Sequence, residues 1–357
     1  MSVESLQLPD LFNDHEAARE AAEVAGAQLD IDTESLALLR FRHRRSWVYA
    51  NNEGENPDVV IKVEPDAEDS LLPERERSVG FIQELQAAGV PVENHLMKPM
   101  RIAVGRAIGE AAVFVATASE YLPGAYEQQA DDYRTYGEAL ARLHGVGSRF
   151  VGRVPGFDPL RVTRETHRQL VELQENDALP QVGLVRLDER LVARLGALIA
   201  AGETSVAELV ESSEANGCPP ALLQSDVTPF NARKDAEGRG VFFDFSHCIT
   251  GPWAYDFGRP LEWYRFGRSP KNVETLLEGY AAHVPWNVDA HMLALGVQIA
   301  HVRYAASPLR RVADMALCGL EPDAYLLHEG VRRLNGEERW QSEEDYIAEQ
   351  TRLTQKF

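Results

Sequence analysis

The chain has 357 residues, a length that favours two packed units over a single core. Hydrophobic residues make up 44% and charged residues 26%, as in an ordinary globular protein. The formal net charge of −20 argues against a nucleic-acid partner, because binding a phosphate backbone requires a basic face. The charge is compatible with a cationic substrate, and equally with a role in solubility alone.

Targeting signals are not visible in the sequence. No apolar run approaches the roughly 20 residues that a membrane span requires, so we expect no membrane partner. The N-terminal stretch is acidic and lacks a basic segment followed by an apolar one. The cysteines are scattered and odd in number, which indicates free thiols: Cys218, Cys248 and Cys318. We therefore expect a cytoplasmic protein.

The first third of the chain combines strand-like and helix-like runs. Asp14 is a helix-capping residue, and the Ala- and Glu-rich residues 15–25 after it predict a helix of about three turns. Apolar residues at helical spacing predict a second helix over 73–88. Apolar, aromatic and β-branched runs predict strands at 36–43, 46–51, 58–63 and 104–119.

The pair Pro123-Gly124 follows the last of these strands and indicates a boundary between two units. Beyond it the pattern is mostly helical, with a short strand at 221–224 and a hairpin turn at 234–240. Helices are predicted over 131–144, 160–175, 188–215, 276–280 and 291–305, and near Glu343. We therefore predict an α+β fold with a β-rich unit over 1–121 and a mostly helical unit over 122–357.

Three polar residues near the hairpin have a spacing that suits chemistry. Asp226 precedes Asn231 by five positions, and Asp244 follows thirteen later inside the apolar run 241–245. An acid among aromatic residues is costly to bury unless it binds a metal or a partner. Phosphoryl transfer uses such a set, with one carboxylate for the acceptor hydroxyl and two oxygen ligands for magnesium. The alternative is an acidic turn beside a hairpin, with no ligand.

This constellation resembles the aminoglycoside phosphotransferase family and its choline- and homoserine-kinase relatives. Their loop reads His-Gly-Asp-x-x-x-x-Asn and is followed by a hairpin and an Asp-Phe-Gly-like metal motif. The resemblance implies that Asp226 is the catalytic base and that Asn231 and Asp244 bind magnesium. Pro229 also matches a proline common in the family loop.

The loop departs from the family pattern at several positions. These are Gln224 for the histidine, Ser225 for the glycine, Thr228 for a second histidine, Phe230 for the glycine before Asn231, and Ser246 in the metal motif. None of these changes removes a proton acceptor or a metal ligand. They do weaken any assignment to a substrate subgroup.

A second motif follows the hairpin. Residues 251–256 resemble the family's Asp-Pro-x-x-Asp-Leu stretch, whose final aspartate accepts hydrogen bonds from the catalytic-loop backbone. The resemblance therefore implies that Asp256 fixes the loop. An acid favoured at a helix N-terminus is a compatible alternative.

The nucleotide-binding residues are expected in the first third. Lys62, inside the β-branched run 59–65, looks like the strand lysine that pairs with the α- and β-phosphates of kinase-like folds. An exposed position on an alternating strand is its structural alternative. We expect Glu76 on the following helix to form an ion pair with Lys62, with Glu74 as the alternative partner.

Two further segments resemble nucleotide-binding parts of the family. The turn over 43–46 is expected to cover the phosphates, with Ser46 offering a hydroxyl and a backbone N–H. Residues 120–124 resemble the family's Met-Glu-x-Leu-Pro-Gly hinge, so the backbone groups of Glu120 and Leu122 are expected to bind adenine. The segments 139–144 and 276–280 resemble family packing signatures.

Together these matches imply a bilobal protein-kinase-like fold, with a β-rich N-terminal lobe and a mostly helical C-terminal lobe. The implied enzyme is an ATP- and Mg²⁺-dependent kinase, with GTP as the alternative nucleotide, that transfers the γ-phosphoryl group to a hydroxyl of a small substrate. An aminoglycoside-like or other cationic antibiotic is the leading substrate by analogy. A metabolic kinase for choline, homoserine or a sugar would use the same residues. A non-catalytic, nucleotide-binding pseudokinase is a further alternative, motivated by the divergent loop.

Overall fold

The computed structural model describes residues 14–42, 46–51, 58–66, 71–105, 111–122, 130–182, 185–228, 231–235, 237–245, 248–262, 270–317, 319 and 321–335. These residues form two compact units. The first unit contains the described residues up to 122 together with 232–245. The second contains those of 130–231 and 248–335.

The first unit is built on a five-stranded antiparallel sheet in the order β1-β2-β3-β5-β4. Its strands are β1 (Leu36–Arg42), β2 (Ser46–Asn51), β3 (Val59–Pro65), β4 (Met100–Val104) and β5 (Ala112–Glu120). The predicted strand over 104–119 corresponds to β5, and the sequence did not predict β4 before it. The other three strands are confirmed, and a 3₁₀ turn, η2 (Thr33–Ser35), precedes β1.

Helix α1 (His15–Ala27) covers one face of this sheet. Asp14 caps it as predicted, by accepting the Ala17 N–H at 2.9 Å. The helix packs against alternate strand residues, among them Trp47, Ile61 and Phe114. Its buried side chains are all small, which lets the helix approach the sheet closely: Ala17, Ala18, Ala21, Ala22 and Ala25.

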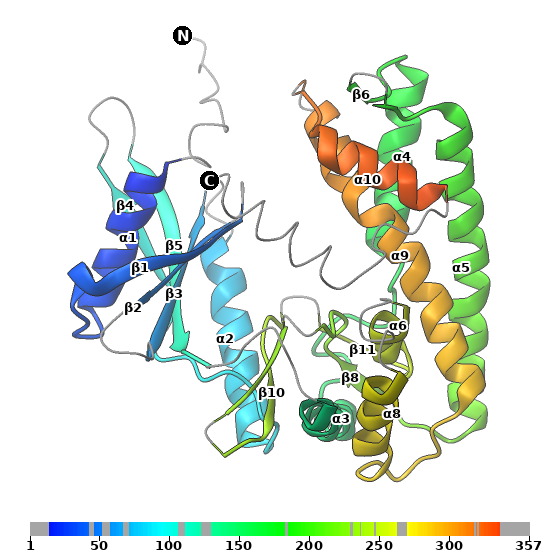
Figure 1. Ribbon diagram of the computed structural model, residues 1–357, viewed down its shortest axis with the longest axis horizontal. Helices are drawn as coiled ribbons and strands as arrows, with labels where there is room; N and C mark the ends of the chain where they lie inside the picture. The colour runs from blue at the N-terminus through cyan, green and yellow to red at the C-terminus, as the bar shows by residue number, and fades with distance from the viewer. Residues whose placement is uncertain are drawn as a thin grey trace. The chain divides into compact units, whose positions relative to one another are not determined.

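Helix α2 (Leu71–Ala87) lies on the opposite side of the sheet from α1 (Figure 1). Asp66, just after β3, accepts the Leu71 N–H at 3.1 Å where the helix begins. Side chains alternate along a strand, and Ile61 belongs to the core beneath α1. Lys62 and Glu64 therefore lie on the α2 side.

The hairpin of β9 (Ala232–Lys234) and β10 (Gly240–Phe242) belongs to the first unit. Val92 and Phe242 form a parallel bridge, and the Glu93 N–H donates to the Phe242 carbonyl at 3.2 Å. The sequence prediction grouped all of 122–357 together, so this assignment is corrected. A Pro-Gly pair marks the point where the chain passes from one unit to the next. It does not indicate that a later segment, here the β9–β10 hairpin, belongs to the first unit again.

The second unit is mostly helical, as predicted. Its short strands β8 (Ala221–Leu223) and β11 (Ile249–Gly251) pair antiparallel. In the described ranges, no helix has the length and apolarity needed to cross a bilayer. The other elements are α3 (Ala130–Gly145), η3 (Gly147–Arg149), α4 (Arg161–Glu175), β6 (Gln181–Val182), β7 (Val185–Arg186), α5 (Glu189–Ala215), α6 (Tyr255–Glu262), α8 (Pro270–Ala281), α9 (Ala290–Leu317) and α10 (Ala324–Leu334).

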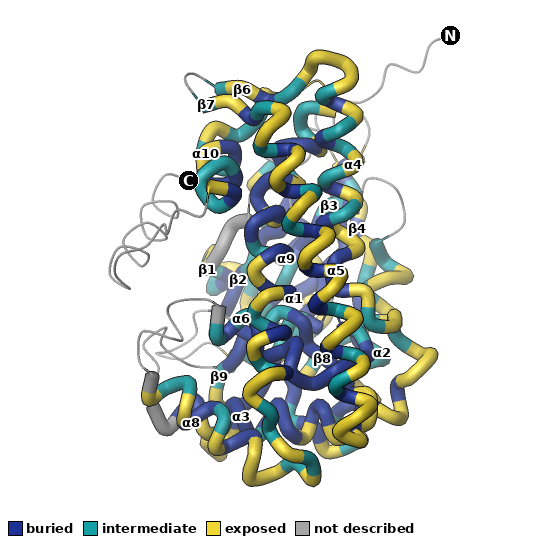
Figure 2. The backbone as a smooth tube through the Cα atoms, turned by 90° about the vertical axis from the view of Figure 1, so that its right-hand side faces the viewer, coloured by how far each residue is buried: buried dark blue, intermediate teal, exposed yellow. Residues whose placement is uncertain are grey.

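The long helix α9 packs against α4, α5, α6 and α10. The buried residues of α5 recur at helical spacing, including Val192, Leu195 and Ile199. One side of α5 is therefore inside the unit while its other side is exposed, as Figure 2 shows. This packing explains why the amphipathic pattern of 188–215 was a reliable helix signal.

Helices α3 and α8 make direct backbone contact. A Cβ atom at Gly137 would collide with the Leu276 carbonyl oxygen, and one at Gly279 would collide with the Arg134 carbonyl oxygen. Only glycine allows this approach. The close crossing brings together side chains that follow these glycines on each helix.

We predict that Gly279→Ala lowers the stability of the protein by about 2 kcal/mol, because overpacking outweighs the better helix propensity of alanine. Gly80→Ala in α2 is the matched control, since no atom lies within 4 Å of the added methyl group. That control should raise stability by roughly 0.5–1 kcal/mol. Thermal unfolding of both variants checks the prediction, and stabilisation by Gly279→Ala would contradict the close crossing.

Candidate active site

The loop after β8 holds the Asp226 carboxylate between two donors. Asn231 Nδ2 donates to Asp226 Oδ2 at 3.0 Å and to the Asp226 carbonyl at 2.9 Å. On the other side, Arg259 Nη1 of α6 forms an ion pair with Asp226 Oδ1. The Asp226 side chain keeps 23% of its surface exposed. It is therefore a fixed carboxylate that a small molecule in solution can reach.

Gln224 stands where the family motif has histidine, and its side chain stabilises the loop. The residue is fully buried, and its Oε1 accepts the Asp226 N–H at 2.7 Å. A side-chain acceptor two residues back thus fixes the backbone of Asp226. Although Gln224 differs from the histidine of the family motif, its side chain still provides a hydrogen-bond acceptor for the loop backbone.

Ser225 replaces the glycine of the family motif and adopts a left-handed backbone with φ +59°. Such a conformation costs a non-glycine residue about 1–2 kcal/mol, so surrounding bonds must hold it. Its N–H donates to Asp256 Oδ1 at 2.7 Å, and its carbonyl accepts from Arg303 Nη1 at 2.7 Å. The glycine of the family motif is explained by this φ, which serine also adopts here.

Asp256, in the first turn of α6, is the centre of a buried hydrogen-bond network. Its Oδ2 accepts the Gln224 N–H at 2.8 Å and lies 3.1 Å from His144 Nε2. Together with the bond from Ser225, the carboxylate thus accepts two consecutive N–H groups of the loop, which is the contact the sequence predicts. Both Asp256 and His144 are at most 2% exposed.

The network continues to Tyr280 on α8, whose hydroxyl lies 2.8 Å from His144 Nδ1. A carboxylate only accepts, so His144 Nε2 donates to Asp256. Burial raises the pKa of the Tyr280 hydroxyl well above its usual value, which keeps its proton in place. Tyr280 can therefore donate to Nδ1 and fix the tautomer of His144. The segments that the sequence identified as packing signatures carry this pair.

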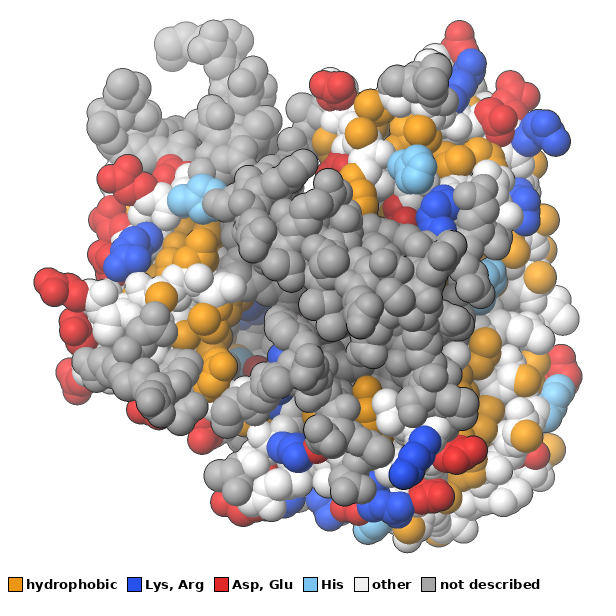
Figure 3. Space-filling view, viewed as in Figure 1, with side chains coloured by type: hydrophobic (Ala, Val, Ile, Leu, Met, Phe, Trp, Pro, Cys, Tyr) orange, Lys and Arg blue, Asp and Glu red, His pale blue; other side chains and the backbone are white. Residues whose placement is uncertain are grey.

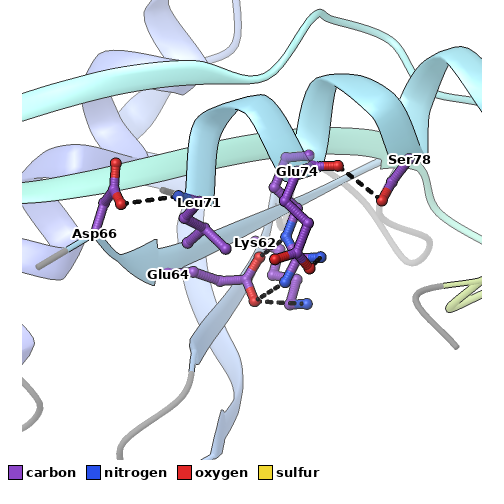
Figure 4. Close-up of polar contacts among 7 residues, drawn as sticks. Lys62, Glu64, Asp66, Leu71, Glu74 and Ser78 are labelled. Carbon is purple, nitrogen blue, oxygen red and sulfur yellow. Dashed lines mark hydrogen bonds and ion pairs between the residues drawn. The ribbon is translucent and has the colours of Figure 1, made fainter. Parts of the chain in front are cut away.

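In the first unit, one carboxylate joins two cations. Glu64 Oε1 lies 3.0 Å from Lys62 Nζ, and Arg75 of α2 donates through Nε to Oε2 at 2.6 Å and through Nη2 to Oε1 at 2.8 Å. Figure 4 shows these contacts. Burial alone would raise the pKa of Glu64, but Lys62 and Arg75 together lower it below its ordinary value. Glu64 is therefore ionised and shared by both cations.

The partner of Lys62 differs from the sequence expectation. Glu76 is exposed on α2, and Glu74 is also exposed and pairs with Arg75 at 3.3 Å. The ion pair of Lys62 is instead with Glu64 on the same strand. Residues two apart on a strand share a face, so the Lys-Val-Glu sequence itself contained the signal. Arg75, rather than a helix glutamate, faces that side of the sheet.

Asp244 follows β10 and has a left-handed backbone with φ +61°. Its N–H donates to Glu93 Oε1 at 3.3 Å. Burial raises the pKa of Glu93 to about 7, and burial lowers the pKa of His95, whose Nε2 lies 3.8 Å from Glu93 Oε1. Sequence analysis identified Asp244 but not Glu93. Only the fold brings Glu93 beside the hairpin.

The sequence model of the phosphotransferase enzyme family, APH, matches residues 37–291. The chain belongs to this family. It is therefore a phosphotransferase. No curated protein matches the sequence significantly.

Solved structures show the same protein-kinase-like fold. A microcompartment-associated aminopropanol kinase is 18% identical with a TM-score of 0.58, over 89% of this chain and 94% of that one. A choline/ethanolamine kinase family protein from Mesorhizobium loti is 17% identical with a TM-score of 0.55, over 89% and 92%. Amicoumacin kinase hAmiN, in complex with AMP-PNP, Ca²⁺ and Ami, is 14% identical with a TM-score of 0.54, over 90% and 95%.

The remaining predicted nucleotide contacts of the phosphotransferase lie at strand ends. Ser46 begins β2 and is buried, while the turn 43–45 before it falls outside the described residues. The Glu120 N–H already donates to the Asn94 carbonyl at 2.8 Å. A contact of Glu120 with adenine would therefore use its carbonyl oxygen. Leu122 is half-buried, and Pro123-Gly124 lies outside the described residues.

The predicted metal ligands offer hard oxygen donors of the kind magnesium prefers. The Asn231 amide nitrogen is used on Asp226, so its Oδ1 is the atom that can bind a cation. Asp244 supplies a carboxylate from the first unit. Within the described ranges, no group of three His, Cys, Asp or Glu side chains forms a ready metal site. Each of the two residues is the kind of oxygen donor that Mg²⁺ takes alongside phosphate oxygens and water.

We predict that Asp256→Ala lowers the free energy of unfolding by about 3 kcal/mol, because it leaves buried N–H groups and His144 without their acceptor. Asp58→Ala, at an exposed position just before β3, is the control and should stay within about 0.5 kcal/mol of wild type. Denaturant unfolding measures both. Equal stabilities of the two variants would show that the Asp256 network contributes little.

Proposed function

We propose that this phosphotransferase is an ATP- and Mg²⁺-dependent small-molecule kinase that phosphorylates a substrate hydroxyl. The observation that carries the proposal is the Asp226 carboxylate, which is held by Asn231 and Arg259 and still partly exposed. Oδ1 is buried against Arg259, so Oδ2 is the oxygen that would orient a hydroxyl and take its proton, because it can accept a further bond beside the one from Asn231.

The first unit supplies the proposed nucleotide-binding residues. Lys62 is held by Glu64 and bears a positive charge suited to the α- and β-phosphates. The carbonyl of Glu120 and the backbone of Leu122 would bind adenine. Asp244 and Asn231 would hold magnesium, which neutralises phosphate charge when bound. The fold relative hAmiN, solved with AMP-PNP and Ca²⁺, is consistent with ATP, whereas another relative of the same fold is a GDP and kanamycin complex, so GTP stays the alternative nucleotide.

The proposed step is an in-line transfer. The substrate hydroxyl oxygen bonds to the γ-phosphorus while the bond from that phosphorus to the bridging oxygen breaks, and ADP leaves. The hydroxyl proton passes to Asp226. Asn231 and Arg259 keep the carboxylate oriented during the transfer. The Gln224 and Asp256 contacts fix the backbone from which it projects.

The first candidate substrate is an aminoglycoside-like or other cationic antibiotic. The net charge of −20 supports it, since acidic proteins concentrate cations. Figure 3 shows acidic side chains along the outer edge of the first unit, whereas on the second unit acidic and basic side chains alternate in this view. The charge therefore favours cations in general and does not locate a binding site for them.

Arg259 favours the second candidate, a metabolic kinase whose acceptor has no ammonium group near its hydroxyl. The Arg259 side chain is 33% exposed, and its guanidinium neutralises the Asp226 carboxylate, which would otherwise attract such a group. Among the metabolic substrates, sugars therefore fit better than choline. Homoserine, which carries both charges, lies between them.

We predict that Asp226→Asn reduces product formation by ~10²–10⁴-fold, because the amide keeps the shape but takes no proton. Affinity for Mg²⁺–AMP-PNP, measured by calorimetry, should be nearly unchanged. Asp158→Asn is the matched control, since Asp158 is an exposed aspartate paired with Arg164 at 2.7 Å. If Asp226→Asn turned over substrate at nearly the rate of that control, Asp226 would not be the catalytic base.

A panel of hydroxylated amines, antibiotics and sugars, tested by thermal shift with Mg²⁺–AMP-PNP, identifies ligands because only a bound compound adds stability. Arg259→Gln should then improve kcat/KM for cationic acceptors relative to neutral ones by roughly 10-fold, since the Asp226 carboxylate loses the cation that neutralises it. Arg161→Gln, exposed at the start of α4, serves as control. An unchanged ratio would contradict the role of Arg259. Nucleotide binding without any turnover would favour the pseudokinase alternative.

A further inference from the structure

We propose that Glu93 is a positioning residue that fixes the backbone of Asp244 for metal binding. The inference rests on the proposed function, because it takes Asp244 as a magnesium ligand. Glu93 lies in the connection between α2 and β4, far from the motif residues in sequence. All of its contacts described below are within the first unit.

The backbone of Glu93 is tied on both sides. Its N–H donates to the Phe242 carbonyl at 3.2 Å, next to the parallel bridge between Val92 and Phe242. Its carbonyl accepts from Gln86 Nε2 of α2 at 3.0 Å. Glu93 is therefore held between a helix and the end of β10, and its side chain starts from a fixed point.

The Glu93 side chain contacts Asp244, the proposed magnesium ligand that follows β10. Glu93 Oε1 accepts the Asp244 N–H at 3.3 Å. Strand pairing of β10 ends at Phe242, so the sheet ladder no longer determines the backbone at Asp244. The left-handed φ of +61° is costly for a non-glycine residue and persists only where neighbours hold it. The Glu93 carboxylate supplies that contact.

A carboxylate is an expensive choice for this position. The Glu93 side chain is only 16% exposed, and an apolar side chain would fill the space without a desolvation cost. Its acceptor oxygen is what an apolar residue could not provide. Partners that orient metal-binding carboxylates typically change metal affinity by about 10–100-fold when removed.

The test compares Glu93→Leu, which removes the acceptor, with Glu93→Gln, which keeps an acceptor oxygen. Calorimetry measures AMP-PNP binding as a function of Mg²⁺ concentration. Glu93→Leu should raise the Mg²⁺ concentration for half-maximal binding by about 10–100-fold, and Glu93→Gln should stay within about threefold of wild type. Binding of AMP-PNP without Mg²⁺ should not change. Glu84→Leu, exposed on α2, is the control.

The outcomes separate the inference from the proposed function. Thermal unfolding first checks that Glu93→Leu is folded, because the lost acceptor costs about 1–3 kcal/mol and the removed desolvation of the carboxylate offsets part of that cost. Wild-type-like Mg²⁺ dependence of a folded Glu93→Leu overturns the positioning role alone. An equal loss in Glu93→Gln and Glu93→Leu also overturns it, because charge rather than the hydrogen bond would then matter. Absence of Mg²⁺-dependent nucleotide binding in the wild type would refute the proposed function, and this inference with it.

Discussion

The catalytic loop of the second unit depends on the buried carboxylate of Asp256, which needs hydrogen-bond donors. Asp256 is removed from water and accepts from two loop N–H groups and from His144. Those bonds compensate for its desolvation, and they also determine where the loop runs. The left-handed backbone of Ser225 follows from them, and so does the position of Asp226 one residue later. Tyr280 completes the set because glycines allow α3 and α8 to touch.

In the first unit the central carboxylate, Glu64, forms ion pairs with two cations instead of accepting backbone N–H groups. Glu64 is ionised between Lys62 and Arg75, and the three charges sum to one positive charge. A strand lysine held this way keeps its extended side chain without a helix glutamate. The lysine–glutamate pair that the resemblance implies has no net charge, so this chain keeps a lysine–carboxylate pair and adds the Arg75 guanidinium to it. Lys62 lies on the predicted strand, but its ion-pair partner is Glu64 on that strand and not a glutamate of α2.

Local pattern predicted much of the fold, because alternation and helical spacing reflect burial on one face. It located β1, β2, β3 and most helices, whereas the contact of Asp256 with loop N–H groups was implied by the family resemblance. It did not reveal Arg75 as the partner of Glu64, Glu93 beside Asp244, or Arg259 beside Asp226. Each of these contacts joins segments distant in sequence, and their pairing depends on how elements pack. A sequence motif specifies which residues lie at given distances along the chain. It does not specify which residues from distant segments pack against them.

Helix α2 has two attachments, and their separation has a mechanical consequence. Arg75 bonds to Glu64 near its start, and Gln86 bonds to the Glu93 carbonyl near its end. Gln86 lies eleven positions after Arg75 on the helix, a rigid length of about 16 Å. A tilt of α2 that withdraws Arg75 from the lysine pair also displaces the segment that supports Asp244. The contacts of the lysine and the backbone support of Asp244 are therefore coupled through one rigid body, and any ligand or substitution that moves α2 alters both together.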